Sequence, residues 1–155
     1  MTEPSGGWPA MSTLVPHQGP MCLLDDVIDV DAHAIRVRLT PRADDLFAET
    51  RGIPVQISLE WMAQASAAWS TLQPGDDQGA PRQGMLLGAR QFRACIDYLP
   101  LDQPLEIRLE VDTVADNGLG AFQGTLYRPG AQADDNAWLA QATLSVLQTP
   151  ASSAL

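Results

Sequence analysis

Two side chains in this sequence have the chemistry of a general acid–base pair, one histidine and one glutamate. His17 lies in a loop between Pro16 and Gln18. Because an unperturbed imidazole titrates at about pH 6.5, it can take up a proton near neutral pH. Glu60 stands among apolar residues, where burial can raise the pKa of a carboxyl group and make it an acid. Together, two such groups can remove one proton and deliver another.

Both residues also have a plainer structural interpretation. Glu60 lies near the start of an expected helix, where the positive end of the helix dipole favours a carboxylate. His17 can instead serve only to fix its proline-rich loop by a hydrogen bond. The other histidine, His33, precedes an exposed strand, and we expect it to be solvated. Sequence distance does not exclude a pairing of His17 with Glu60, since catalytic partners meet in space.

Composition excludes several other kinds of function. Nineteen acidic and nine basic residues give a formal net charge of -10, which disfavours a broad basic surface for nucleic acid. No Cys/His cluster has zinc spacing and no glycine-rich phosphate loop is present, so we expect neither a metal nor a cofactor. Cys22 and Cys95 are expected to be small buried residues in a reducing compartment. Without a signal peptide or a long apolar run, the chain is expected to be cytoplasmic, with no membrane insertion.

The element that must position Glu60 is a helix predicted over residues 54–72. Pro54 suits a first helical turn, and Pro74 with Gly75 provides a stop. Apolar residues and alanines occupy nearly every side of this segment. A helix that is hydrophobic all round is buried, and its alanines let another element approach closely.

Alternating patterns elsewhere predict strands. One strand is expected to begin near Cys22, and another covers 35–39. Residues 85–95 are expected to form a central strand followed by a partly exposed one. Three more are expected at 105–111, 119–128 and 138–147, with Asn117 and Gly118 as a hairpin turn. The segments 41–53 and 74–82 are expected to be loops.

One buried helix and several strands that mostly follow it indicate an α+β domain with an antiparallel sheet. We expect a flexible lead-in over 1–10, a single domain over 11–149 and a flexible tail over 150–155. A chain of this length folds without needing a disulfide or a metal.

Three motifs, in order, resemble one family. The run from Leu14 to Val27, LVPHQGPMCLLDDV, resembles the PHRxPFLLVDRV signature of bacterial 3-hydroxyacyl-carrier-protein dehydratases. Residues 57–65, ISLEWMAQA, resemble the start of their central helix, and residues 86–93, LLGARQFR, resemble a later strand. The PHxGPM form and the run from Asn117 to Gly120 are most similar to the dehydratases of aryl polyene clusters. This resemblance implies a hotdog fold, in which the sheet wraps around one long central helix.

The sequence departs from that family at one important position. The common dehydratases carry a catalytic histidine in a loop, fourteen residues before the helix acid. That position is Leu46 here, in a segment without histidine. If a histidine of this chain replaces the missing base, it is His17.

The resemblance also implies a set of site residues and partners. His17 and Glu60 are the expected catalytic residues. Gln64, one helical turn after Glu60, could orient its carboxyl or simply pack. Gly52 and Gly88 are candidate backbone donors to a thioester oxygen, although Gly88 could equally mark a bulge. The substrate would arrive on the phosphopantetheine of an acyl carrier protein. Arg90 and Arg93, with Arg51 and Arg82, could form a basic patch for this acidic carrier, or could be ordinary solvated surface residues.

Three functions remain open at this point. The first is dehydration of a 3-hydroxyacyl chain on acyl carrier protein to the trans-2-enoyl thioester, in fatty-acid-like or aryl polyene biosynthesis. The second is a hotdog acyl thioesterase, in which Glu60 activates water. The third is a non-catalytic subunit of a mixed dehydratase dimer. The resemblance implies either a homodimer or a mixed dimer with a second hotdog dehydratase, with the active site shared across the interface, and an acyl tunnel beside the helix.

Overall fold

A six-stranded antiparallel sheet and one helix make up most of the molecule. The computed structural model describes residues 7–16, 19–74, 84–130 and 137–148. The sheet has the strand order β1-β2-β6-β7-β8-β4. Its strands are β1 (Asp26–Val30), β2 (Ala34–Leu39), β6 (Leu105–Val114), β7 (Leu119–Tyr127), β8 (Trp138–Gln148) and β4 (Gly84–Ala94). The strands β3 (Ile53–Pro54) and β5 (Tyr98–Leu99) pair in a small second sheet.

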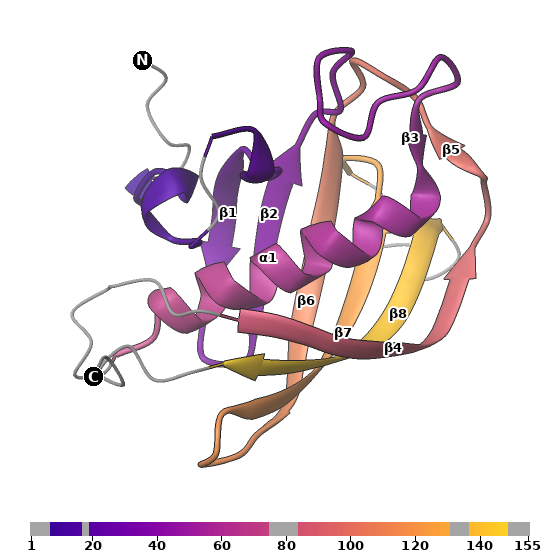
Figure 1. Ribbon diagram of the computed structural model, residues 1–155. Coiled ribbons are helices and arrows are strands. Elements are labelled where there is room, and N and C mark those ends of the chain that lie inside the picture. The colour runs from indigo at the N-terminus through magenta and orange to yellow at the C-terminus, as the bar shows by residue number, and fades with distance from the viewer. Residues whose placement is uncertain (1–6, 17–18, 75–83, 131–136, 149–155) are drawn as a thin grey trace.

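The helix α1 (Ser58–Thr71) crosses the concave face of the large sheet, which curls around it (Figure 1). A short 3-10 turn (Val55–Ile57) leads into it. Trp61, Met62, Ala65 and Ala68 are buried against the sheet. Gly124 of β7 permits this close approach, because a Cβ there would meet the Met62 sulfur at 2.5 Å. The predicted hotdog architecture is therefore confirmed.

The predicted hairpin at Asn117 and Gly118 is also confirmed. The Gly118 N–H donates to the Ala115 carbonyl at 3.0 Å, and Gly118 has a φ of +91°. Such a backbone conformation favours glycine. The predicted loop at 74–82 lies almost wholly outside the described residues, as do the ends 1–6 and 149–155. Within the lead-in, the Trp8 indole N–H donates to the Ile28 carbonyl at 3.2 Å.

The prediction for residues 85–95 is wrong in one respect. They form a single strand, β4, at the edge of the sheet, paired on one side with β8. Met85 and Leu87 are therefore exposed, at 62% and 53%. The cysteine prediction also needs correction, because Cys95 is exposed beyond this strand and Cys22 is half-buried; both are free thiols.

The packing of the aromatic residues is that of an ordinary core. Trp61 and Trp69 are buried, and Trp69 meets Phe122 edge-on with ring centroids 5.9 Å apart. The Trp69 indole N–H also donates to the Asp31 carbonyl at 3.0 Å. Edge-on aromatic pairs of this kind stabilise a core beyond the area they bury.

Candidate functional site

Glu60 borders a cavity between the helix and the edge of the sheet. It lies in the first turn of α1 and is half-buried. The cavity has a volume of about 380 Å³, within the usual range for small-molecule sites. Small residues of α1 line one wall, and β4 and β8 provide the other: Ala63, Ser66, Ala67, Met85, Leu86 and Val146. Among the described residues of this lining, Glu60 is the only charged one.

The carboxylate of Glu60 is not committed to the fold. The described residues give it no hydrogen-bond or ion-pair partner. A charged group in apolar surroundings normally has such a partner. Met85 and Leu86, which also line the cavity, belong to the edge strand β4. Within the described part of the chain, a carboxyl group without a partner therefore borders an apolar slot beside the edge strand β4.

Gln64 points to a different part of the molecule. It is wholly buried, and its side-chain amide bridges α1 to the chain before β1. Its Oε1 accepts from the Leu23 N–H at 2.9 Å, and its Nε2 donates to the Met21 carbonyl at 2.7 Å. This arrangement supports the packing interpretation and gives no support to orientation of Glu60.

Neither histidine is placed beside Glu60 by the described residues. His17 lies outside them, so its pairing with Glu60 stays a prediction. His33 is exposed, as expected, and its backbone N–H donates to Asp31 Oδ1 at 2.7 Å. Leu46, at the position where related dehydratases carry their base, is 53% exposed.

The two candidate glycines differ in what their backbones can offer. The Gly52 N–H donates to the Glu49 carbonyl at 3.0 Å within a tight turn, so it is not available to a thioester. Gly52 is needed for packing instead, because it has a φ of +123° and a Cβ there would collide with the Leu99 carbonyl. Gly88 follows an irregularity in the pairing of β4 with β8, which supports the bulge interpretation.

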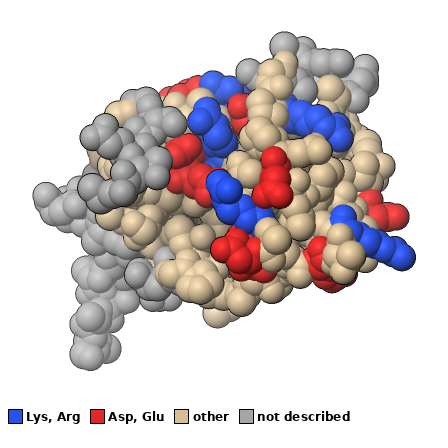
Figure 2. Space-filling model, turned by 90° about the horizontal axis from the view of Figure 1, so that it is seen from above, with Lys and Arg blue, Asp and Glu red and all other residues tan. Residues whose placement is uncertain are grey.

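Three of the four arginines of the predicted basic patch lie on the surface of the described residues. Arg90 and Arg93 are both exposed on β4, and Arg93 lies over the Trp138 ring at 5.6 Å. Arg51 lies over the Tyr98 ring at 5.7 Å, whereas Arg82 lies outside the described residues. On the face shown in Figure 2, basic and acidic side chains alternate without a continuous basic area.

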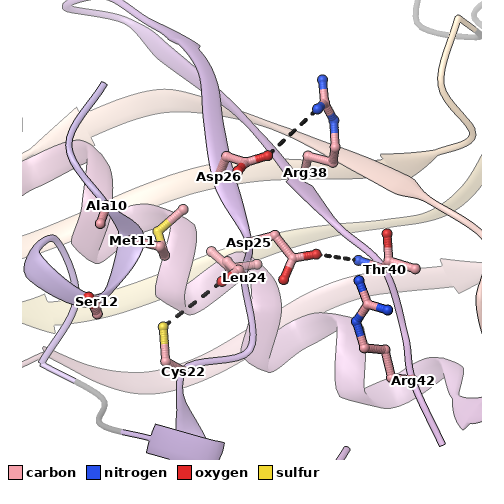
Figure 3. Close-up of a pocket in the computed structure, with 10 residues that line it drawn as sticks. All are labelled: Ala10, Met11, Ser12, Cys22, Leu24, Asp25, Asp26, Arg38, Thr40 and Arg42. Atoms are coloured by element: carbon pink, nitrogen blue, oxygen red, sulfur yellow. Dashed lines mark hydrogen bonds and ion pairs between the residues drawn. The ribbon is translucent and has the colours of Figure 1, made fainter. Parts of the chain in front are cut away.

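A second hollow lies near the start of β1 and the end of β2, away from Glu60. The sequence did not indicate it. It has a volume of about 490 Å³ and contains Asp25, Thr40 and Arg42 (Figure 3). Asp25 Oδ2 accepts the Thr40 N–H at 2.8 Å. Asp25 faces the hollow, but loss of hydration by burial raises the pKa of its carboxyl group. The hydrogen bond from the Thr40 N–H and the positive charge of Arg42 lower this pKa by a smaller amount.

This raised pKa has a consequence for stability. The folded state holds the Asp25 proton to higher pH than the unfolded chain does. The favourable contribution of Asp25 to the free energy of unfolding is therefore complete below pH 3.8. It is lost as the pH rises through the pKa of Asp25 in the folded state. Asp25→Asn is therefore expected to raise the free energy of unfolding at neutral pH, with the gain disappearing in acid. Urea unfolding across this pH range measures the difference.

Asp31 provides a control of opposite sign. Backbone N–H groups of His33 and Ala34 lower its pKa, so its contribution is present above pH 3.8 and is lost as pH falls through the folded pKa. Asp31→Asn should therefore lower stability at neutral pH. Equal shifts in the two variants would contradict this account of Asp25.

The antiparallel sheet wrapped around one helix defines a hotdog-fold protein. A family model described as ApeP-like, ApeP dehydratase, matches residues 9–155. The chain therefore belongs to the ApeP-like dehydratase family, as the motifs predict. No curated protein sequence matches the chain.

One solved structure supports this assignment. A chain of the dehydratase heterocomplex ApeI:P from Xenorhabdus doucetiae is similar with a TM-score of 0.81 and 26% identity, over 93% of each chain. Two other chains share the fold at lower similarity. A hypothetical thioesterase from Streptococcus pneumoniae, in a structure with coenzyme A, has a TM-score of 0.56 and 10% identity over 80% of this chain and 84% of that one. A thioesterase from Haemophilus influenzae has a TM-score of 0.56 and 8% identity over 80% of this chain and 77% of that one.

The structure also bears on a membrane location. None of the helices in the described part of the chain is long and apolar enough to cross a bilayer.

Proposed function

We propose that the chain takes part in dehydrating a 3-hydroxyacyl group on acyl carrier protein to the trans-2-enoyl thioester, in aryl polyene biosynthesis. Glu60 is the general acid. The observation that carries this proposal is the free carboxyl group of Glu60 at an apolar slot, in a chain of a dehydratase family. The proposed substrate needs no cofactor of the protein, since it brings its own phosphopantetheine.

The elimination requires two groups on the reacting carbons. A base removes a proton from C2, the C3–O bond breaks, and the protonated Glu60 gives its proton to the departing hydroxyl, which leaves as water. The electron pair of the C2–H bond forms the new double bond. The base then returns its proton to Glu60, which restores both groups for the next turnover.

We infer that a second hotdog subunit supplies the base. Leu46 occupies the position at which related dehydratases carry their histidine, and the slot with Glu60 opens beside the edge strand β4. An unpaired strand edge is a ready template for pairing with another chain. The similar structure ApeI:P is itself a heterocomplex, which supports a mixed dimer. The alternative is His17 of this chain, and mutation separates the two.

The acyl chain would run along α1 away from Glu60. Ala63 and Ala67 lie three and seven residues after Glu60, on the same helical face, and both line the slot. Leu86 and Val146 provide an apolar wall opposite. Burial of methylene groups against such a wall stabilises the bound chain by roughly 0.8 kcal/mol for each group.

Hydrolysis of the thioester is the second candidate, because thioesterases share this fold and can use a carboxylate to activate water. Mass spectrometry of the acyl carrier protein after incubation distinguishes the two reactions. Dehydration leaves the acyl chain attached and lighter by one water. A freed carrier thiol would instead favour the thioesterase and contradict the proposal.

The exposed apolar residues of β4 allow a test of the partner surface. Leu87→Asp is expected to weaken association with the second subunit at least tenfold, since it would bury a charge at the interface. Val114→Asp is the matched control, because both side chains are 53% exposed and Val114 lies at the end of β6. Calorimetric titration measures both. Equal weakening would argue against β4 as the contact.

A further inference from the structure

We propose that the Gln148 side chain closes the slot at the end far from Glu60 and limits the length of the acyl chain that the protein accepts. This inference rests on the proposed function for the kind of ligand, and on the geometry of the slot for the limit. Gln148 is the last residue of β8 and is half-buried. It would determine specificity and take no part in the chemical step.

The slot follows α1 and ends one turn before the helix does. Its lining on the helix begins at Glu60, continues with Ala63 and ends with Ser66 and Ala67. Among the described residues of the lining, none comes from the last turn of the helix. Because an α-helix rises about 1.5 Å per residue, Glu60 and Ser66 are roughly 9 Å apart along its axis. The slot therefore has a defined length, which begins at the reacting group.

Gln148 crosses from the sheet to the helix at the far end of this lining. Its Nε2 donates to the Ser66 carbonyl at 3.5 Å. Val146, two residues earlier in β8, lines the slot, and residues two apart in a strand project from the same face. β8 runs along α1 and ends beside the second half of the helix (Figure 1). The Gln148 side chain therefore lies just past Val146, on the side away from Glu60.

The bridge from Gln148 to the helix is not needed by the helix itself. A distance of 3.5 Å is long for this hydrogen bond, since N–H donors usually lie about 2.7–3.2 Å from the oxygen. The Ser66 carbonyl belongs to the interior of α1, where a carbonyl accepts the N–H four residues later. Removal of the amide should therefore lengthen the slot without leaving a backbone group unsatisfied.

An amide at the end of an apolar slot opposes a longer chain in two ways. The side chain of Gln148 fills the space that further methylene groups would take. In addition, the described residues give its Oε1 no partner, so this oxygen depends on water. An apolar chain that reached Gln148 would displace that water, and a buried polar group without a partner is costly.

The dimensions of the slot give the expected limit. An extended chain advances about 1.2 Å per bond, a third of the roughly 3.6 Å that an extended backbone advances per residue. The roughly 9 Å between Glu60 and Ser66 therefore hold about seven carbons beyond the carbon that reacts at Glu60. Since that carbon is C3 of the substrate, the limit should be a chain of about ten carbons.

The experiment measures binding by the full chain and does not require turnover. The probes are saturated acyl thioesters of N-acetylcysteamine, which have no 3-hydroxyl group and cannot be dehydrated. In calorimetric titrations the affinity should rise about fourfold with each added methylene group and level off at about ten carbons. In Gln148→Ala the limit should move to chains about two carbons longer, because the substitution removes Cγ and the amide group.

Gln141→Ala is the matched control. Gln141 is also a half-buried glutamine of β8, but it lies an odd number of residues from Gln148 and so projects from the opposite face. Its Oε1 accepts from Arg93 at 3.1 Å, which places it away from α1. The limit in Gln141→Ala should equal that of the parent.

Three results would overturn the inference. An unchanged limit in Gln148→Ala would make Gln148 only a latch between the strand and the helix. An equal shift in Gln141→Ala would assign the effect to β8 as a whole. An affinity that shows no levelling with chain length would remove the end of the slot altogether.

The outcome is separate from that of the proposed function. Probes that bind with a limit set by Gln148, to a chain that removes no water from a 3-hydroxyacyl carrier, would contradict dehydration alone. Dehydration together with a limit that is the same in Gln148→Ala would contradict this inference alone.

Discussion

Replacing Glu60 with glutamine is expected to lower the rate of dehydration by roughly 10²–10⁴-fold, the usual contribution of a general acid. The amide has nearly the same shape but cannot deliver a proton to the departing hydroxyl. Because the Glu60 carboxylate has no partner among the described residues, its replacement breaks no hydrogen bond or ion pair within that part of the fold. The loss should therefore fall on kcat, with little change in stability or in substrate affinity.

A matched variant separates this effect from a general change of charge. Glu49→Gln removes a carboxylate from an exposed loop residue whose recorded contacts with Gly52 involve only backbone atoms. It should leave the rate within about twofold of the parent, as surface substitutions usually do. Single-turnover kinetics on a 3-hydroxyacyl carrier protein measure both variants. Equal rates for Glu60→Gln and the parent would remove Glu60 from the mechanism.

Gln64→Leu is expected to destabilise the fold strongly. Leucine has a similar volume, but it would leave the Leu23 N–H and the Met21 carbonyl without their partners. Each unsatisfied buried group costs about 1–3 kcal/mol, so the free energy of unfolding should fall by about 3 kcal/mol. Urea unfolding gives this value.

Gln73→Leu is the control for this prediction. Gln73 also uses its side-chain amide on backbone carbonyls, those of Asp31 and Trp69, at 3.1 and 3.2 Å. Its side chain is half-buried at the end of α1, where water can replace these bonds, so the loss should stay within about 1 kcal/mol. Comparable losses in the two variants would show that the buried bridge of Gln64 has no special weight.

The sequence predicts the elements of this fold well because their signals are local. Alternation along 105–111 and the turn residues Asn117 and Gly118 report the face of each strand and its end. The position of β4 at the edge of the sheet is not local, since it depends on which strands pair. Apolar residues such as Met85 and Leu87 are typical of a buried central strand, so the sequence predicts burial. In the structure both are exposed, because β4 lies at the edge of the sheet.

The candidate site also contains some residues with a local sequence signal and others whose role depends on distant parts of the chain. Glu60 is conspicuous in the sequence because it is a charge in an apolar helix. The role of Gln64 cannot be recognised in the sequence, because its hydrogen-bond partners lie 41 and 43 residues away in the chain. Asp25 also carried a signal, a carboxylate directly after an apolar run, but that pattern is equally typical of a strand entrance. Only the packing of β2 beside it makes the hollow evident.

In the proposed mechanism, Glu60 acts as the acid of a dehydratase whose base comes from a second subunit. Mass spectrometry of a 3-hydroxyacyl carrier protein tests it most directly, with the chain alone, with a second hotdog dehydratase that carries the loop histidine, and with both together. The account predicts rapid loss of one water only in the mixture, abolished by Glu60→Gln and unaffected by His17→Ala. Loss of water by the chain alone that disappears in His17→Ala would contradict it.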